Sequence, residues 1–182
     1  MEIQTPHCVV RSYRANDASS LALHANNRKI WLNLRDRFPH PFGEADGAAY
    51  IADVLTRARP TSFAIAVDGV AVGGISLRVG TDIERLSAEL GYWLGESFWG
   101  RGIVSEAVAA ITDFGFRELR LVRIFAVPFA HNTASHRVLE KAGYQHEGVL
   151  RAAALKDGQI LDEHLYARIN AAAVPGLYPP AA

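Results

Sequence analysis

The segment from Glu89 to Ala107 places a strand, a glycine-containing loop and a helix in direct succession. Its apolar residues alternate with others up to Gly95, which is typical of a half-buried strand, and a helical pattern begins at about Arg101. The first amide N–H groups of a helix have no partner inside the helix, and the helix dipole adds partial positive charge there. Because glycine lets the backbone approach a ligand closely, this junction predicts a binding site for a phosphate group.

The remaining elements predict a mixed α/β fold. Asp68-Gly69 is a strong hairpin signal, Gly73-Gly74 indicates a bulge, and Gly143 suits the end of a helix. We expect strands at residues 7–13, 61–67, 70–79, 87–94, 122–127, 145–155 and 160–169, and helices at about 17–25, 28–37, 44–59, 101–119 and 133–142. Since strands and helices do not alternate regularly, we expect a mixed sheet with helices on its faces rather than a doubly wound fold.

Length and composition limit the kinds of partner. The chain has 182 residues, 49% of them hydrophobic, which fits a single domain with a substantial core. Lysine plus arginine and aspartate plus glutamate number 19 each, so the net charge is zero and nucleic-acid binding is disfavoured. Cys8 is the only cysteine, and no apolar run reaches the roughly 20 residues of a membrane helix. We therefore expect a cytoplasmic protein with no membrane partner, folded over residues 1–172, with residues 173–182 as a loose tail.

Two common phosphate-binding patterns do not fit the junction. Residues 95–102 have the glycine spacing of a P-loop, but Ile103 and Val104 stand where that loop needs Lys and then Ser or Thr. The dinucleotide pattern G-x-G-x-x-G also fails, because Ser105 occupies the place of its third glycine. A nucleoside triphosphatase and a dinucleotide-binding enzyme are therefore both disfavoured.

Two segments resemble motifs of the GNAT superfamily, the Gcn5-related N-acetyltransferases. Motif A of that family reads R/Q-x-x-G-x-G/A; Gly102 matches its central glycine and Val104 its final small residue, whereas Trp99 departs from the initial Arg or Gln. About thirty residues later, Asn132–Tyr144 (NTASHRVLEKAGY) looks like motif B, N-x-x-S-x-R-V-L-E-K-x-G-F/Y. The resemblance implies the GNAT fold, which is a single mixed, mostly antiparallel sheet of about seven strands with helices on both faces.

The form of motif B is similar to that of the Rim-type branch, which includes ribosomal-protein N-terminal acetyltransferases. RVLEKAG carries this likeness together with YWLG, FWG and the earlier DRFPHPF. Leu139 stands where many GNAT enzymes have a tyrosine that protonates the leaving thiolate. The resemblance implies acetyl-CoA as co-substrate and a primary amine as acceptor, either a peptide N-terminus or a small molecule.

By resemblance, the phosphate site would bind the coenzyme A pyrophosphate through backbone N–H groups, with Arg101 as a charge partner. The pantetheine arm would run beside the strand that ends at Leu94, and Asn132 would contact it, although Asn132 also suits a helix N-cap. A backbone N–H near Trp93 or Leu94 would stabilise the oxyanion. The expected coenzyme-binding residues are Tyr92, Trp93, Leu94, Trp99, Gly100, Arg101, Gly102, Ile103, Val104, Ser105 and Asn132.

Two residues are candidate catalytic groups. Glu89 lies on the strand beside the expected acetyl site and could take the proton of the amine; the alternative is a solvated carboxylate on an exposed strand face. Ser135 matches a motif B position whose hydroxyl can reach the sulfur in some Rim-type enzymes; the alternative is a small residue in a tight helical turn. The sequence has no H-E-x-x-H motif and no cysteine pair, so we expect no metal site.

The leading prediction is an acetyl-CoA-dependent N-acetyltransferase in which the amine attacks the thioester directly in a ternary complex. The alternative is a non-catalytic GNAT-fold module that binds or senses an acyl-CoA, and the departures at Trp99 and Leu139 keep it open. A phosphate-ester enzyme is a weaker third alternative, because the sequence has no evident carboxylate cluster for Mg²⁺. The sequence makes no prediction about the oligomeric state or the identity of the acceptor amine.

Overall fold

The computed structural model describes residues 1–175, and these contain one eight-stranded sheet. The strands lie in the order β1-β2-β3-β4-β5-β6-β8-β7, and every neighbouring pair is antiparallel except β5 and β6. Their bounds are β1 Glu2–Gln4, β2 Val9–Arg11, β3 Ser62–Val67, β4 Val70–Val79, β5 Ser87–Leu94, β6 Arg123–Ala126, β7 Gln145–Lys156 and β8 Gln159–Ile169. The prediction of a single mixed, mostly antiparallel sheet is confirmed, and β1 is the strand that the sequence pattern did not predict.

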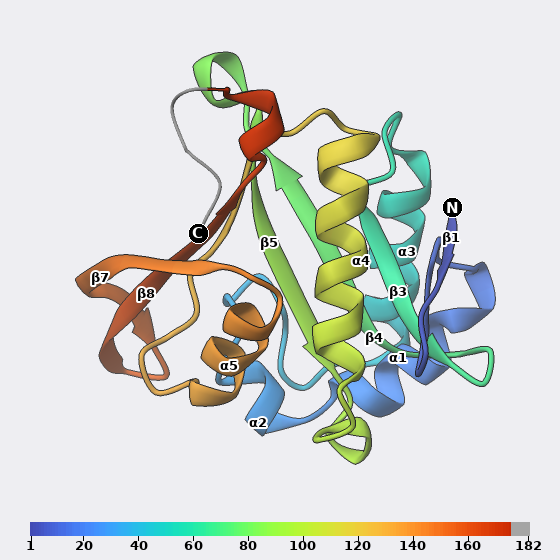
Figure 1. The fold of residues 1–182 in the computed structure, drawn as a ribbon. Coiled ribbons are helices and arrows are strands. Elements are labelled where there is room, and N and C mark those ends of the chain that lie inside the picture. Colours follow the sequence, from blue (N-terminus) through green and yellow to red (C-terminus); the bar gives the residue numbers. More distant parts are fainter. Residues whose placement is uncertain (176–182) are drawn as a thin grey trace.

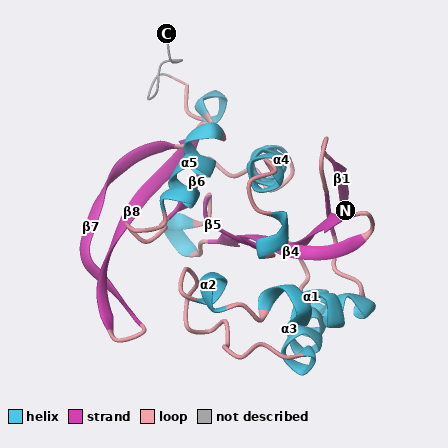
Figure 2. Ribbon diagram, turned by 90° about the horizontal axis from the view of Figure 1, so that it is seen from below, coloured by secondary structure: helices cyan, strands magenta, loops and turns pink. Residues whose placement is uncertain are grey.

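Helices cover both faces of this sheet (Figure 1). Figure 2 shows α1, α2 and α3 on one face and α4 and α5 on the other, as predicted. The helices are α1 Ala18–Ala25, α2 Arg28–Trp31, α3 Glu44–Thr56, α4 Ile103–Arg117 and α5 Thr133–Lys141. One cluster of buried side chains, including Phe63 and Ile111, lies between α4 and the sheet, and a second, including Leu21 and Phe42, lies under α1 and α3.

Helix α4 packs closely on the sheet through one apolar face. Ile103, Ala107 and Ile111 recur at the spacing of one helical face, and all three are buried. At Gly115 an added Cβ would come within 2.7 Å of the Ile124 side chain and 2.9 Å of Leu77, so a larger residue would force these buried side chains to shift. The packing fixes the N-terminal end of α4 against the loop that leaves β5.

The helix predicted over residues 28–37 ends earlier than expected. In the structure α2 stops at Trp31, and the chain then continues in turns as far as Gly43. Phe38 in this segment stacks on Phe42 with ring centroids 4.9 Å apart and meets the ring of Trp93 edge-on at 5.8 Å. Aromatic packing over β5 therefore outweighs the helical pattern of these residues.

The sheet divides between β5 and β6, which is the feature that positions the site. These two strands pair only where residues 87–89 lie beside residues 123–125, and β6 ends at Ala126. The second half of β5, as far as Leu94, therefore has β4 on one side and no strand on the other.

The described part of the chain has no helix with the length and apolar character needed to cross a bilayer. Residues 176–182 of the expected tail lie outside the described residues.

Candidate active site

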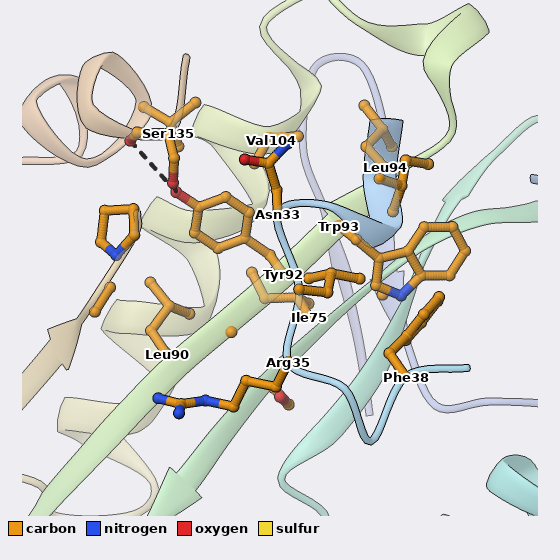
Figure 3. Close-up of a pocket in the computed structure, with 18 of the residues that line it drawn as sticks. Asn33, Arg35, Phe38, Ile75, Leu90, Tyr92, Trp93, Leu94, Val104 and Ser135 are labelled. Carbon is orange, nitrogen blue, oxygen red and sulfur yellow. Dashed lines mark hydrogen bonds between the residues drawn. The ribbon is translucent and has the colours of Figure 1, made fainter. Parts of the chain in front are cut away.

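A cavity of about 1360 Å³ opens where the sheet divides, and it extends from the N-terminus of α4 to the segment after α2 (Figure 3). Every candidate residue from the sequence lines it. They come from four places in the fold: strand β5, the loop before α4, the first turn of α4, and the start of α5. The lining residues predicted from sequence are Glu89, Tyr92, Trp93, Leu94, Trp99, Gly100, Arg101, Gly102, Ile103, Val104, Ser105, Asn132 and Ser135.

The backbone of β5 presents unpaired polar groups to this cavity. The Gly95 N–H donates to the Val72 carbonyl at 2.8 Å, which sets the alternation of hydrogen bonds between β4 and β5. By that alternation the N–H and C=O of Trp93 point to β4, and those of Tyr92 and Leu94 point to the divided side. The Leu94 carbonyl accepts from the indole N–H of Trp99 at 2.8 Å. Of the two expected oxyanion donors, the Leu94 N–H therefore faces the cavity and the Trp93 N–H does not.

The loop before α4 forms a concave set of amide donors. Gly100 and Gly102 adopt φ angles of 76° and 80°, in the left-handed region that favours glycine. Gly102 is the N-cap of α4, and no side chain caps the helix there. The amide N–H groups of residues 100–105 have no acceptor among the described residues. This arrangement suits an anion, because the unpaired donors and the helix dipole act at the same place.

Basic side chains lie beside these donors. Arg101 is held against the loop: its guanidinium donates to the Ser97 carbonyl at 2.8 Å and lies 5.3 Å from the centroid of the Phe98 ring. Arg137 and Lys141 are four residues apart on α5, hence on one face of that helix, and both line the cavity. The sequence reasoning did not select these two residues, although Arg137 stands inside motif B.

Two hydroxyl groups meet across the cavity. Tyr92 Oη and Ser135 Oγ are 2.6 Å apart, and either can donate to the other (Figure 3). Burial raises the pKa of the Tyr92 hydroxyl well above its usual range, and the hydrogen bond to Ser135 only partly offsets this effect. The phenol therefore stays protonated at neutral pH. Leu139, at the place of the family's tyrosine, is fully buried and does not reach the cavity.

Asn132 caps helix α5, which is the second role that the sequence predicted for it. Its side-chain oxygen accepts from the Ser135 N–H at 3.1 Å. This bond fixes the first turn of α5 and hence the position of the Ser135 hydroxyl. The amide nitrogen of Asn132 makes no hydrogen bond with another described residue, so it remains a donor for a ligand in the cavity that Asn132 lines.

Glu89 lies within an arginine clamp. One carboxyl oxygen accepts from Arg35 at 2.7 Å and the other accepts from Arg78. The side chain is only 14% exposed, which argues against the solvated carboxylate considered from sequence. Each carboxyl oxygen thus has an arginine neighbour, so a cationic amine that approached Glu89 would meet two guanidinium groups.

Glu163 of β8 is a second carboxylate in the cavity lining, and the sequence reasoning gave it no catalytic role. The residue is 9% exposed, and its side chain has no hydrogen bond or ion pair with any residue in the described range. No sequence motif marks Glu163, since its significance depends on the strand order β6-β8-β7. Within residues 1–175, no group of three or more His, Cys, Asp or Glu is placed to hold a metal ion.

Comparison with known proteins agrees with this geometry. Residues 7–145 match the family described as the acetyltransferase (GNAT) domain. The uncharacterized N-acetyltransferase p20 of Bacillus licheniformis is 40% identical over 89 residues, which are 49% of this chain and 50% of that protein. The ribosomal-protein-serine acetyltransferase of Escherichia coli is 36% identical over 83 residues, 46% of each chain. The chain thus spans about half the length of the curated relatives it matches.

Solved structures extend the likeness to the whole fold. The structure of Mycobacterium smegmatis RimJ in complex with CoA-disulfide has a TM-score of 0.79 and 27% sequence identity. The match covers 92% of this chain and 84% of that one. The likeness in fold therefore extends beyond the segment that the curated relatives share.

Proposed function

Because this chain belongs to the acetyltransferase (GNAT) domain family, we propose that it transfers an acetyl group from acetyl-CoA to a primary amine. The observation that carries the proposal is the meeting of three features in one cavity. They are the amide donors of residues 100–105, the unpaired edge of β5, and the hydroxyl pair of Tyr92 and Ser135. Together they match the diphosphate, the pantetheine amides and the thioester of one ligand.

Acetyl-CoA would be bound mainly by the backbone. The amides of residues 100–105 would hold the pyrophosphate, and Arg137 and Lys141 would add positive charge near the phosphates. The exposed N–H and C=O groups of Tyr92 and Leu94 would pair with the pantetheine arm, and the free amide nitrogen of Asn132 would donate to it. Fixing the thioester in this way supplies rate by orientation.

The hydroxyl pair provides a proton for the leaving group. When the C–S bond breaks, the sulfur takes the electron pair, and Ser135 Oγ would donate a proton to it. Tyr92 would donate to Ser135 in turn, since its buried phenol keeps its proton. A free thiol has a pKa of about 8.5, so modest assistance is enough for departure.

We infer that the acceptor is the α-amine of a peptide or protein N-terminus. The name of the Escherichia coli relative, ribosomal-protein-serine acetyltransferase, supports this class of acceptor. An α-amine has a pKa near 8, so it loses its proton far more readily than a lysine side chain. A small-molecule amine is the alternative acceptor. A cytoplasmic place of action belongs to the same proposal, since it follows from such an acceptor.

Release of free thiol tests the proposal directly. The protein is incubated with acetyl-CoA and a panel of amines that contains Ser- and Ala-initiated peptides, a lysine side-chain peptide and small amines. We expect thiol release that depends on one class of amine. Ser135→Ala should lower kcat about 10²-fold and leave the Kd of acetyl-CoA unchanged. Binding without transfer to any amine, together with indifference to Ser135→Ala, would instead support the non-catalytic acyl-CoA sensor.

A further inference from the structure

Glu163 is a buried carboxylate that has no partner within residues 1–175. Only 9% of the residue is exposed, and no described side chain or backbone group forms a hydrogen bond or ion pair with its carboxylate. The carboxylate oxygens of Glu163 are not fully enclosed by protein atoms. Because Glu163 lines the cavity, the small part of the residue that remains exposed faces the cavity. Burying an unpaired charge is unfavourable, and proteins usually avoid it. A carboxylate in this position, which lines the cavity and has no partner among the described residues, is placed to meet a cationic group of a ligand.

The strand register places Glu163 on one particular face of the sheet. Glu89 on β5, Phe125 on β6 and Ala167 on β8 are direct neighbours, so their side chains share a face. Glu163 precedes Ala167 by four residues on the same strand and therefore points the same way. This is the face that α1, α2 and α3 cover (Figure 2).

The hydroxyl pair lies on the opposite face. Tyr92 is an odd number of residues from Glu89 on β5, and it meets Ser135 of α5, which covers the other side of the sheet. The division of the sheet connects both faces, since the same cavity is lined by Glu163 and Ser135. A thioester held in the division would thus have a proton donor for sulfur on one face and a carboxylate on the other.

We propose that Glu163 binds the ammonium form of the acceptor amine and takes its proton before the attack on the thioester. The inference rests on the proposed acetyl transfer. At pH 7 an α-amine with a pKa near 8 is mostly protonated, so it would bind first as a cation. A largely buried carboxylate attracts such a cation more strongly than one surrounded by water, because the effective dielectric constant is lower. Glu163 would then act both as an acceptor-binding group and as the general base.

Most of the other charged side chains on this side of the sheet are paired, whereas Arg37 and Arg59 of the cavity lining form no hydrogen bond or ion pair with a described residue. Glu89 is held by Arg35 and Arg78, which occupy both of its oxygens. The remaining pairs are Lys156 with Asp36, Arg28 with Asp157, and Lys29 with Glu96, and the His131 ring is hydrogen-bonded to Asn33. Two arginines around Glu89 would also repel an incoming ammonium. Glu163 is therefore better placed for this role than Glu89, and the third carboxylate of the cavity lining, Asp46, accepts from the Gly43 N–H at the start of α3.

The step balances in atoms and charge. One proton passes from the ammonium to the Glu163 carboxylate, and the nitrogen lone pair forms the C–N bond to the carbonyl carbon. When the intermediate collapses, the C–S bond breaks and its electron pair goes to sulfur, which takes a proton from Ser135. The nitrogen then loses its second proton, which passes across the cavity to Ser135 and restores its hydroxyl group. Glu163 then returns its proton to solvent, and the net products are the amide, free coenzyme A and one H⁺.

Matched variants of the two carboxylates test the proposal. Glu163→Gln and Glu89→Gln are assayed by thiol release with the best peptide from the amine panel, between pH 6 and 10. For Glu163→Gln we expect a kcat about 10²- to 10³-fold below that of the unmodified chain at pH 7. The loss should shrink above pH 9, where the amine is already neutral. Glu89→Gln should show no such pH-dependent loss, and both variants should bind acetyl-CoA with an unchanged Kd.

A binding measurement separates acceptor recognition from chemistry. Calorimetric titration of the same peptide into the protein saturated with coenzyme A, which cannot react, should show about tenfold weaker binding for Glu163→Gln than for the unmodified chain. The melting temperature of Glu163→Gln should be equal or higher, since the change removes an unpaired buried charge. Glu163→Asp, which keeps the charge, should retain part of the activity if Glu163→Gln folds poorly.

The outcomes discriminate between this inference and the proposed function. If the unmodified chain transfers acetyl groups and Glu163→Gln has an unchanged pH profile and peptide affinity, the role of Glu163 is refuted and acetyl transfer stands. If Glu89→Gln instead shows the pH-dependent loss, the general base is Glu89 and the proposal is wrong. If the unmodified chain binds acetyl-CoA and transfers to no amine, the proposed function fails and this inference fails with it.

Discussion

At the scale of single residues, Gly102 connects backbone geometry to ligand binding. Its φ of 80° orients the free amides before α4, and an added Cβ would meet no atom within 4 Å, so the space beside it is open. Gly69, in the β3–β4 turn, has a φ of 81° and is equally open. The two glycines therefore form a matched pair, with only Gly102 in the cavity lining.

Replacing each of these glycines by glutamate separates strain from binding. Gly102→Glu and Gly69→Glu should each lose about 1–2 kcal/mol of unfolding free energy, because both force a side chain into the left-handed region. Only Gly102→Glu should weaken acetyl-CoA binding, by tenfold or more, since it adds bulk and negative charge beside the diphosphate. Calorimetric titration and urea unfolding measure the two effects. Equal acetyl-CoA affinity in the two variants would argue against the amide cradle.

The sequence could identify the residue types of the site but not the state of each carboxylate. The sequence predicts Glu89 as a candidate proton acceptor because it lies on the strand beside the expected acetyl site. In the structure Glu89 does line the cavity. Its clamp by Arg35 and Arg78 depends on contacts across 54 and 11 residues, which no local pattern encodes. No local pattern marks Glu163 for the same reason, because its burial is a property of the assembled sheet.

At the scale of elements, the start of α5 has two functions that one side chain can separate. Asn132 caps the helix through its oxygen, and its nitrogen is available to the ligand. Asn132→Asp keeps an oxygen for the cap and removes the donor, whereas Asn132→Ala removes both. This difference distinguishes a purely structural asparagine from one that also contacts the coenzyme.

We expect Asn132→Ala to lose about 1 kcal/mol of unfolding free energy and Asn132→Asp to lose less than half of that. Both should raise the Kd of acetyl-CoA, because neither can donate to the pantetheine arm. Urea unfolding and calorimetric titration of the two variants provide the comparison. Unchanged acetyl-CoA binding by Asn132→Asp would leave Asn132 with the capping role alone.

Most elements could be predicted because local signals and tertiary packing agree. The hairpin at Asp68-Gly69 and the end of α5 before Gly143 are examples: Asp68, Gly69 and Gly143 all adopt positive φ. The helix predicted to Arg37 failed because Phe38 packs on Phe42 and Trp93 instead of continuing a helical face. β1 was missed because three residues are too few for a period to be recognised, and pairing with β2 alone defines the strand.

At the scale of the whole molecule, the tip of the β7–β8 hairpin is fastened to the segment around α2. The Lys156 ammonium lies 3.6 Å from the centroid of the Trp31 ring and 2.7 Å from Asp36. Asp157 at the same tip forms an ion pair with Arg28 at 2.5 Å. These contacts join residues about 120 positions apart in the chain.

The buried lysine should contribute more to stability than its carboxylate partner. Lys156→Met keeps the apolar stem and loses the cation over Trp31, so we expect a loss of about 1–2 kcal/mol of unfolding free energy. The Asp36 side chain is 70% exposed, and Asp36→Asn should cost less than about 0.5 kcal/mol. Urea unfolding checks both values. A larger loss for Asp36→Asn than for Lys156→Met would contradict this account of the tip.

The division of the sheet is the large-scale feature that sequence patterns could only imply. Motif A indicated an anion site and motif B a second helix, but the distance between them depends on where β5 and β6 stop pairing. That point is set by the end of β6 at Ala126 and by the crossover that inserts β8 next to it. The cavity follows from this topology, and so does the placement of Ser135 and Glu163 on its two sides.

A crystal structure of the protein with bound coenzyme A tests the central claim most directly. We predict pyrophosphate oxygens within hydrogen-bonding distance, about 2.7–3.2 Å, of backbone nitrogens in residues 100–105. The pantetheine amides should pair with the backbone of Tyr92 and Leu94, and the sulfur should lie beside Ser135. Coenzyme A bound with its diphosphate away from residues 100–105, or with its arm outside the division between β5 and β6, would contradict the account.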